Sequence, residues 1–440
     1  MTELFNVTYG NMREFIFDSY ASHIIRALLL FLGGCDMEDG SLRSTLSQKD
    51  QNRRQQQQPR QQQQQSTPKI RCLNDASKAK YKPMLEQFCE KCLSLGINDM
   101  VQNDVTSPVL QAMLKALKSQ KSTLADSACE RIINESQSFG AKDSTAIPPI
   151  WNESAGFCRL VEELLAASSK TRLKSIYKHH IKPRLPALAL SSSAPNFVLQ
   201  RFLRSIRTPT LFALVVEDVF RNMESFVVKA SQRAAIVAVA EKCIEFGTHQ
   251  DEFVEALVVA LKCGAADTRR KFALLVADFK TYDSLFGNEN NNENLVQVRV
   301  SLHGSLLLQK LFSFGCPDVA FHSFMTLPPS QLAAFACDPS GCHVFDAIFS
   351  SPSIDDAKLN KFVSRMKSSL VTMATSKCGS RVIDALWKRS AVKNKIEVAE
   401  ALTKQLGRIS GDRFGKFIAR NLQLDNFALR KEQWVKEIQA

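Results

Sequence analysis

The chain has 440 residues, of which 45% are hydrophobic and 23% charged, as in an ordinary folded protein. Its 57 Lys and Arg residues exceed its 44 Asp and Glu residues, so the formal net charge of +13 favours an anionic partner such as nucleic acid. No stretch approaches the roughly 20 apolar residues of a membrane-spanning helix, so we expect no membrane association.

One short amphipathic helix pattern recurs along the chain. In chain order it appears as ASHIIRALL from Ala21, TSPVLQAML from Thr106, FCRLVEELL from Phe157, PNFVLQRFL from Pro195, GSLLLQKLF from Gly304, GCHVFDAIF from Gly341, GSRVIDALW from Gly379 and GKFIARNL from Gly415. The four glycines are separated by 37 (304 to 341), 38 (341 to 379) and 36 (379 to 415) residues. A fixed period of this size predicts a solenoid of stacked helical repeats. We expect each glycine to let its helix lie close to a neighbouring backbone.

The interval from Pro195 to Gly304 is 109 residues (195 to 304), or about three periods. This length predicts two degenerate repeats in the interval, whose second helices lie near residues 231–243 and 268–279. Together with the eight readable repeats, these two inferred repeats bring the expected number to ten.

Two polar stretches interrupt the array. Ten of the 15 residues from 51 to 65 are glutamine, and such a tract cannot supply an apolar core. We predict a first repeat at 1–35, a disordered glutamine-rich insertion at 36–78, a second repeat at 79–135, a polar insertion at 136–150, an array of about eight repeats at 151–430 and a C-terminal tail or cap at 431–440. The first repeat begins almost at Met1 with no element to cap the end of the solenoid, so we expect an array truncated at its N-terminus.

Each repeat pattern leaves polar side chains at three positions of its helix. In SRVID, the adjacent apolar residues Val382 and Ile383 face inward, so the first, second and fifth positions lie on the other side. Two short polar groups can grip the edge of a nucleobase while a flat side chain stacks on its face. The candidate RNA-binding positions are Ser22, His23 and Arg26; Ser107 and Gln111; Cys158, Arg159 and Glu162; Asn196, Phe197 and Gln200; Ser305 and Gln309; Cys342, His343 and Asp346; Ser380, Arg381 and Asp384; and Lys416, Phe417 and Arg420.

A basic segment, KTRLKSIYKHHIKPRL, follows the third repeat. Basic residues interleaved with an aromatic one are candidates for phosphate contacts, here Lys174, Lys178, Lys182 and Arg184. A solvated face between helices fits the same pattern equally well, and the sequence leaves both interpretations open.

The residues that carry catalysis or bind metals form no motif. No nucleophile motif, Gly-rich phosphate loop or ligand cluster is present, and we expect no enzyme, no metal and no cofactor. Cys89 and Cys92 form one C-x-x-C, but no second pair follows at zinc spacing, so we expect both to belong to a helix core. The 12 cysteines suit a reducing compartment.

The repeats resemble those of Pumilio (PUF) proteins, which read one RNA base per repeat. The segments ASHIIRALL, THQDEFVEALVVALK, TYDSLFG, DPSGCHVFDAIF and SKCGSRVIDALW are similar to the nucleolar protein nine family, more than to the Puf-A family. This resemblance implies an all-α, curved solenoid of PUF-like helical repeats in the nucleolus or nucleus. It further implies binding to the small-subunit precursor rRNA and a delay of its premature processing during ribosome biogenesis. We expect a monomer, with proteins of the pre-ribosomal particle as candidate partners.

The resemblance also implies base preferences. Asn196 with Gln200 would suit uracil, Ser107 with Gln111 and Ser305 with Gln309 would suit adenine, and Cys158 with Glu162 would suit guanine. Asp346 and Asp384 depart from the PUF pattern because their side chains are one methylene shorter than Gln or Glu. Lys416 and Arg420 suit phosphate better than a base edge.

Two other functions remain open on the sequence alone. A HEAT- or armadillo-like scaffold for protein interactions would have the same period and core, and a PUF-type regulator would act on mRNA instead of pre-rRNA. Six of the eight readable repeats place Ser, Cys or Asn four residues before Gln, Glu or Asp, which favours RNA binding over a generic scaffold face.

Overall fold

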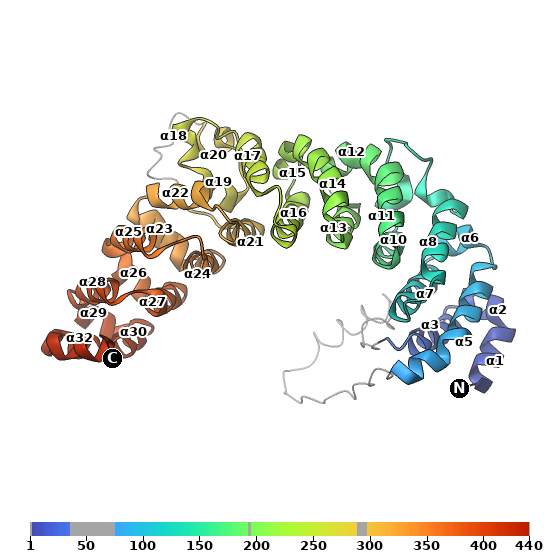
Figure 1. Ribbon diagram of the computed structural model, residues 1–440, viewed down its shortest axis with the longest axis horizontal. Helices are drawn as coiled ribbons and strands as arrows, with labels where there is room; N and C mark the ends of the chain where they lie inside the picture. The colour runs from blue at the N-terminus through green and yellow to red at the C-terminus, as the bar shows by residue number, and fades with distance from the viewer. Residues whose placement is uncertain (1, 36–74, 192–194, 288–296, 440) are drawn as a thin grey trace, which may run out of the picture. The chain divides into compact units, whose positions relative to one another are not determined.

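The computed structural model describes residues 2–35, 75–191, 195–287 and 297–439, and over these ranges it is helical with no β-strand (Figure 1). The chain divides into two compact units, Met1–Leu188 with Ser193–Leu211, and Ala189–Ser192 with Phe212–Ala440. None of the described helices is both long and apolar enough to cross a bilayer. The predicted glutamine-rich insertion lies outside the described residues up to position 74, and residues 75–78 already belong to a helix.

In the first unit, the helices that carry the repeat pattern stack in chain order. We call them motif helices, and here they are α3 (Ala21–Leu32), α7 (Ser107–Ser119), α10 (Ala155–Ala167) and α13 (Pro195–Ser205). Each packs directly on the next one. The remaining helices of this unit are α1 (Thr2–Gly10), α2 (Met12–Phe17), α5 (Asp75–Leu93), α6 (Ile97–Gln102), α8 (Leu124–Glu135), α9 (Pro149–Glu153), α11 (Lys170–Ile176) and α12 (Leu185–Leu190), the last of which ends in the second unit.

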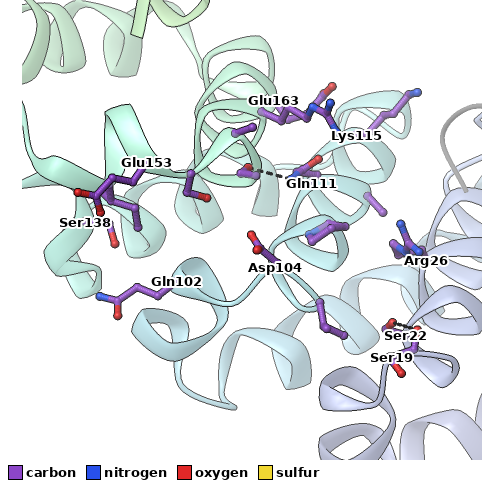
Figure 2. Close-up of a pocket in the computed structure, with 18 of the residues that line it drawn as sticks. Ser19, Ser22, Arg26, Gln102, Asp104, Gln111, Lys115, Ser138, Glu153 and Glu163 are labelled. Atoms are coloured by element: carbon purple, nitrogen blue, oxygen red, sulfur yellow. Dashed lines mark hydrogen bonds between the residues drawn. The ribbon is translucent and has the colours of Figure 1, made fainter. Parts of the chain in front are cut away.

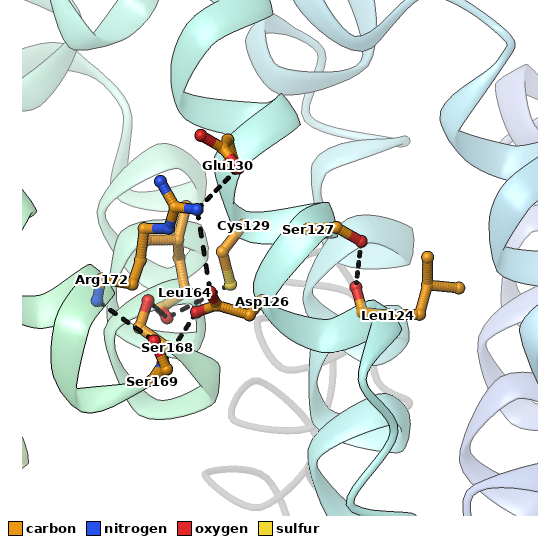
Figure 3. Close-up of polar contacts among 9 residues, drawn as sticks. All are labelled: Leu124, Asp126, Ser127, Cys129, Glu130, Leu164, Ser168, Ser169 and Arg172. Carbon is orange, nitrogen blue, oxygen red and sulfur yellow. Dashed lines mark hydrogen bonds and ion pairs between the residues drawn. The ribbon is translucent and has the colours of Figure 1, made fainter.

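Polar contacts join the helices that lie behind the motif helices. Asp126 of α8 accepts a hydrogen bond from the backbone N–H of Ser169 at 2.9 Å, immediately before α11 begins (Figure 3). Arg172 of α11 donates to Glu130 of α8 at 2.7 Å. The helix dipole favours a carboxylate at a helix N-terminus, so these contacts fix the position of α11 relative to α8.

In the second unit, the motif helices are α16 (Arg233–Phe246), α21 (Leu302–Leu311), α24 (Cys342–Ser350), α27 (Lys377–Arg389) and α30 (Gly415–Asn421), again stacked in chain order. The other helices are α14 (Pro209–Arg221), which begins in the first unit, α15 (Met223–Val228), α17 (Gln250–Ala260), α18 (Ala266–Arg269), α19 (Phe272–Asp278), α20 (Tyr282–Phe286), α22 (Asp318–Thr326), α23 (Pro329–Cys337), α25 (Asp356–Met366), α26 (Leu370–Ala374), α28 (Val392–Thr403), α29 (Leu406–Gly411), α31 (Leu424–Leu429) and α32 (Lys431–Gln439).

The segment 268–279 does not form a repeat of its own, and that prediction is wrong. Motif helix α16 packs directly on α21, and α19 packs against α21 as α26 does against α27 and α29 against α30. Helix α19 therefore belongs to the α21 repeat, as the helix that packs against the motif helix from before it. Four motif helices in the first unit and five in the second make nine within the described residues. A long connection after α19, not an additional repeat, accounts for the extra spacing before Gly304.

The motif glycines bring each helix against the helix before it, as predicted. A Cβ atom added at Gly379 would lie 2.5 Å from the carbonyl oxygen of Met373 in α26. Real Cβ atoms do not approach backbone that closely, so only glycine allows this packing. The same overlap would occur at the other three glycines, between Gly304 and Ala277, Gly341 and Phe335, and Gly415 and Ile409.

A capping side chain lies three residues before each motif glycine. Asp412 accepts the N–H of Gly415 at 2.8 Å, and this bond and that from Phe414 lower the pKa of its carboxyl group. Such caps satisfy amides that have no partner inside the helix. Ser or Asp followed three residues later by Gly is a signal that our sequence interpretation missed. The other pairs are Ser301 with Gly304 at 3.1 Å, Asp338 with Gly341 at 2.8 Å and Ser376 with Gly379 at 3.4 Å.

The predicted C-terminal tail forms helix α32, which packs on the last repeat. Trp434 is 1% exposed, and its indole N–H donates to the carbonyl oxygen of Leu422 at 3.0 Å. Its ring also lies edge-on to that of Phe427, with 4.7 Å between ring centroids. Burying a large aromatic side chain whose polar atom is satisfied stabilises the end of the stack.

Candidate nucleic-acid interface

The third and fourth positions of the motif form the core, so the other positions are left for contacts. Val198 and Leu199 in α13 are fully buried, and Val382 and Ile383 in α27 are at most 1% exposed. This burial confirms the inward face that the sequence predicts. The first, second and fifth positions share the remaining face of each motif helix.

The first-position side chains are wedged between neighbouring repeats. Ser107 donates to the carbonyl oxygen of Gly156 at 3.3 Å, and Ser305 donates to that of Ser340 at 2.5 Å, both in the next repeat. Their hydroxyl protons are therefore already used inside the protein. Six first-position residues are at most 6% exposed, namely Ser22, Ser107, Cys158, Asn196, Ser305 and Cys342.

The second-position side chains stand out from this row. Phe197 is 59% exposed and Phe417 is 47% exposed. Arg159, His343, Arg381 and Lys416 are also exposed. A ligand can thus reach these second positions directly, whereas at the fifth position Arg26 and Gln200 are more than nine-tenths buried and only Asp346 and Arg420 are exposed. The sequence interpretation assigned the first and fifth positions to the edge of a base and the second position to its face, and the burial of the first positions is what the structure adds.

Three of the predicted pairs are joined by a hydrogen bond from the fifth position to the first. The amide nitrogen of Gln200 donates to Asn196 Oδ1 at 3.0 Å, and that of Gln309 donates to Ser305 Oγ at 3.0 Å. Gln111 donates to Gly156 O at 3.1 Å and, at 3.4 Å, to Ser107 Oγ. These amides are therefore oriented before any ligand arrives, which lowers the entropic cost of binding.

The pairs that carry Asp are not joined in this way. Ser380 donates to the carbonyl oxygen of Lys377 at 3.1 Å, and no hydrogen bond connects it to Asp384 within the described residues. Asp346 lies 3.5 Å from His343 Nδ1, and both side chains are exposed. The shorter acid therefore does not reach the first-position side chain.

In the third repeat, the side chains at the first and fifth positions, Cys158 and Glu162, both have raised pKa values. Burial raises the pKa of the Cys158 thiol to about 11, with the nearby Glu162 adding to the effect. The thiol donates to the carbonyl oxygen of Trp151 at 3.2 Å. Burial also raises the pKa of Glu162, opposed by the charge of Arg201. Cys158 is thus an internal contact, while Arg159 remains exposed.

In the last repeat, an exposed ring lies between two cations. The Lys416 ammonium is 5.4 Å and the Arg420 guanidinium 5.5 Å from the centroid of the Phe417 ring. Cations attracted to an aromatic face keep that side chain oriented. An aromatic ring flanked by positive charge can stack on a base while the cations contact adjacent phosphates.

The basic segment divides into exposed lysines and one buried arginine. Lys174, Lys178 and Lys182 are exposed and stay candidates for phosphate contacts. Arg184 is fully buried, so the prediction that it contacts phosphate is wrong. Its guanidinium donates to four backbone carbonyl oxygens, those of Ala146 at 2.9 Å, His180 at 3.0 Å, Ala141 at 3.0 Å and Phe139 at 3.4 Å.

Cys89 and Cys92 are fully buried in α5, so the prediction that they belong to a helix core is confirmed. Burial raises the pKa of Cys92 to about 12 and raises that of Cys89 as well. Both thiols therefore stay protonated at neutral pH.

A pocket of about 1400 Å³ lies over α3, α7 and α10, with part of the polar insertion along one side (Figure 2). The structure brings predicted residues of three repeats together in it, namely Ser22, His23, Arg26, Gln111 and Arg159. The insertion contributes Gln137, Ser138 and Pro148. A pocket shared by three consecutive repeats is suited to an extended ligand.

Stacked motif helices with exposed second positions and ordered fifth positions define a PUF-repeat protein, a class of RNA-binding α-solenoids. Residues 1–417 match the NOP9-like PUF repeat domain, and the chain belongs to this family. The resemblance predicted from the sequence is thus confirmed.

The relatives carry the name nucleolar protein 9. The mouse protein is 30% identical over 96% of this chain and 67% of its own length, and the human protein is 28% identical over 96% and 66%. The protein from Aspergillus fumigatus is 24% identical over 97% of this chain and 62% of its own length. The chain thus spans about two thirds or somewhat less of these relatives. It is a nucleolar protein, as predicted.

Solved structures with this fold are PUF proteins. The structure of APUM23-GGAUUUGACGG superposes with a TM-score of 0.67 at 18% identity, covering 98% of this chain and 77% of that one. PUF-8 in complex with PBE-RNA gives 0.57 at 11% identity, covering 96% and 94%. At such identities the likeness shows the fold alone, and it confirms the predicted α-solenoid of PUF-like repeats.

Proposed function

We propose that this protein binds small-subunit precursor rRNA in the nucleolus and regulates its processing during ribosome biogenesis. The observation that carries the proposal is a set of fifth-position amides, such as those of Gln200 and Gln309, each hydrogen-bonded to the first-position residue of its own helix. A protein scaffold has no need for amides oriented in this way on several motif helices. Membership of a family whose members are named nucleolar protein 9 supports the choice of a ribosomal RNA precursor.

The solved structures with this fold also support RNA as the ligand. PUF-8 is in complex with PBE-RNA, and the Puf4 RNA binding domain is bound to the HO endonuclease RNA 3′ UTR recognition sequence. By analogy, the strand would lie across the motif helices, with Phe197 and Phe417 stacking on bases. Exposed cations such as Lys416 would neutralise phosphates.

Regulation in this proposal requires no catalytic step by the protein. A bound strand is covered by the motif helices, so processing nucleases reach it only after the protein leaves. The rate of processing then depends on occupancy, and hence on affinity and dissociation rate. Proteins of the pre-ribosomal particle would act by changing that occupancy.

A salt titration with three RNAs tests the proposal. The first is a small-subunit pre-rRNA fragment, the second an unrelated structured RNA of equal length and the third an mRNA 3′ UTR with a PUF recognition sequence. We expect affinity for all three to fall steeply with salt, because phosphate contacts release counterions. At moderate salt the pre-rRNA fragment should bind most tightly, and Asn196→Ala with Gln200→Ala should narrow its advantage.

Other outcomes assign other functions. Tightest binding to the 3′ UTR would instead indicate an mRNA regulator. Failure to bind any RNA would contradict the proposal and favour a HEAT- or armadillo-like scaffold.

A further inference from the structure

Arg26 on α3 is a buried cation that lines the large pocket of the first unit. The residue is 7% exposed, and burial lowers the pKa of its guanidinium. Its Nη2 atom donates to His23 Nδ1 at 2.5 Å. Its Nε atom is buried and has no hydrogen-bond partner. Arg184, in contrast, is buried with four backbone carbonyl oxygens around it.

A guanidinium remains charged at any ordinary pH and offers only donors. Removing such a group from water is unfavourable unless oxygen atoms replace the lost hydration. Over the described ranges Arg26 makes no ion pair, and its one polar contact is a ring nitrogen of His23. The site therefore lacks the negatively charged oxygen that this residue type binds best.

The charges around the pocket are arranged unevenly. Arg26 and Lys115 lie on the side of α3 and α7, with Glu163 near Lys115 in this view, while Glu153 and Ser138 lie on the opposite side with Asp104 between them (Figure 2). Carboxylates repel a phosphate group and Arg26 attracts it, so an anionic ligand is directed to the Arg26 side. The acidic side remains suited to the N–H groups of a base.

The wall opposite Arg26 is held firmly. Trp151 is 1% exposed, and its indole N–H donates to Ser138 O at 3.1 Å. The backbone N–H of Asp143 donates to His179 O at 2.9 Å, and the Arg184 guanidinium binds three carbonyl oxygens of the same insertion. The pocket is consequently preformed, as binding sites for specific ligands usually are.

We propose that Arg26 is a phosphate-binding residue, which anchors one RNA phosphate in the pocket between α3, α7, α10 and the 136–150 insertion. This inference rests on the proposed function. The volume of about 1400 Å³ exceeds the roughly 300–1,000 Å³ of sites for single small molecules, so more than one nucleotide fits. A phosphate contact sets the register of the strand and reads no base, so the first repeat positions the RNA.

Replacing the cation tests this assignment in the full chain. Arg26→Gln should weaken binding about ten- to hundredfold, the range for a charge-assisted contact. The slope of log affinity against log salt should fall in magnitude by about 1, and the loss should be equal for several RNA sequences. Arg26→Lys should keep the wild-type slope while losing part of the affinity, because it retains the charge without the fork of donors.

Arg13→Gln on α2 is the matched control, since it removes an exposed arginine from the same repeat. It should not change affinity beyond the effect of net charge. Thermal unfolding of each variant shows whether it is folded. Should Arg26→Gln unfold, the comparison of Arg26→Lys with wild type carries the test, and an affinity identical to wild type would then overturn the assignment.

RNAs with and without a 5′-phosphate identify the source of the phosphate. If Arg26→Gln lowers the affinity for both RNAs equally, Arg26 binds a backbone phosphodiester. If it lowers the affinity only for the 5′-phosphorylated RNA, Arg26 binds the terminal phosphate. Loss of preference at a single base with an unchanged salt slope would overturn the phosphate assignment, as would unchanged binding by folded Arg26→Gln. Absence of RNA binding by the wild-type protein would instead contradict the proposed function itself.

Discussion

The side-chain amide of Gln200 donates to the side-chain oxygen of Asn196 at 3.0 Å, and both residues are more than nine-tenths buried. The bond joins positions one and five of a single motif helix, one turn apart. The bond orients the Gln200 amide before a ligand binds, and it thereby fixes which hydrogen bonds this repeat can make to the ligand. The neighbouring Phe197 ring is left exposed beside this pair.

This bond should appear as coupling between the two residues in RNA binding. In a double-mutant cycle of Asn196→Ala and Gln200→Ala, we expect a coupling free energy of about 0.5–3 kcal/mol. The equivalent cycle at Ser380 and Asp384, which share no hydrogen bond, should give less. RNA affinities of the four variants in each cycle provide the measurement, and equal coupling in both repeats would contradict preorganisation by this bond.

Gly379→Ala should destabilise the protein by about 1–3 kcal/mol, the usual cost of overpacking. The new methyl group would lie 2.5 Å from the Met373 carbonyl, and backbone cannot move aside as a flexible side chain can. Gly407→Ala is the control, because its Cβ would meet nothing within 4 Å in α29. That variant should gain about 0.5–1 kcal/mol through helix propensity. Urea unfolding compares the two, and equal effects would be inconsistent with the proposed close packing.

Phe417→Ala should lower RNA affinity about ten- to hundredfold, since stacking of one base on an aromatic ring contributes about 1–3 kcal/mol. Phe417→Tyr should bind like the wild type because it keeps the ring. Phe417→Leu should behave like the alanine variant, since it retains apolar area without a π face. Binding titrations at one salt concentration distinguish these cases. Retention of full affinity by the leucine variant would show that stacking is not the contact.

Arg184→Met should destabilise the protein by about 3 kcal/mol or more, because four buried carbonyl oxygens lose a charged donor. Lys178→Met, at an exposed neighbour, should change stability by no more than about 0.5 kcal/mol. Proteolysis should also cleave the 136–150 insertion faster in the Arg184 variant. A stable variant with an unchanged cleavage rate would contradict the role of Arg184 in holding the insertion.

Acidification should destabilise the protein through His180. Burial, the nearby Arg184 charge and other cations lower its pKa from 6.5 to about 4, so the folded protein holds this ring neutral. The unfolded chain binds the proton below pH 6.5, hence this stability is present above pH 6.5 and is lost as the pH falls toward 4. Between pH 7 and 5 the loss should be roughly 2 kcal/mol.

His180→Phe should remove the contribution of His180 to the pH dependence of the free energy of unfolding, while it keeps an aromatic ring beside Phe139. Urea unfolding of both proteins at pH 7 and pH 5 measures the difference. An identical pH dependence in wild type and His180→Phe would show that His180 is protonated in the folded protein as readily as in the unfolded chain.

The sequence alone was sufficient to identify the eight readable repeats, their inward-facing apolar positions and the close approach of the helix at Gly379 to its neighbour. These features are local, because helical spacing and a period of 36–38 residues are written into consecutive positions. The C-x-x-C of α5 was also assigned to the core from the sequence, because no second pair follows it at zinc spacing.

Only the tertiary structure decided which polar residues of that pattern are available to a ligand. Lys178 and Arg184 belong to one basic segment, yet only Arg184 is covered, by carbonyl oxygens about 40 residues earlier in the chain. Arg26 looked like any fifth-position residue until the structure showed it to be a buried cation without an anionic partner. The segment 268–279 likewise has the composition of a motif helix and packs behind one. Burial and hydrogen bonding depend on partners distant in sequence, and spacing along the chain does not encode those partners.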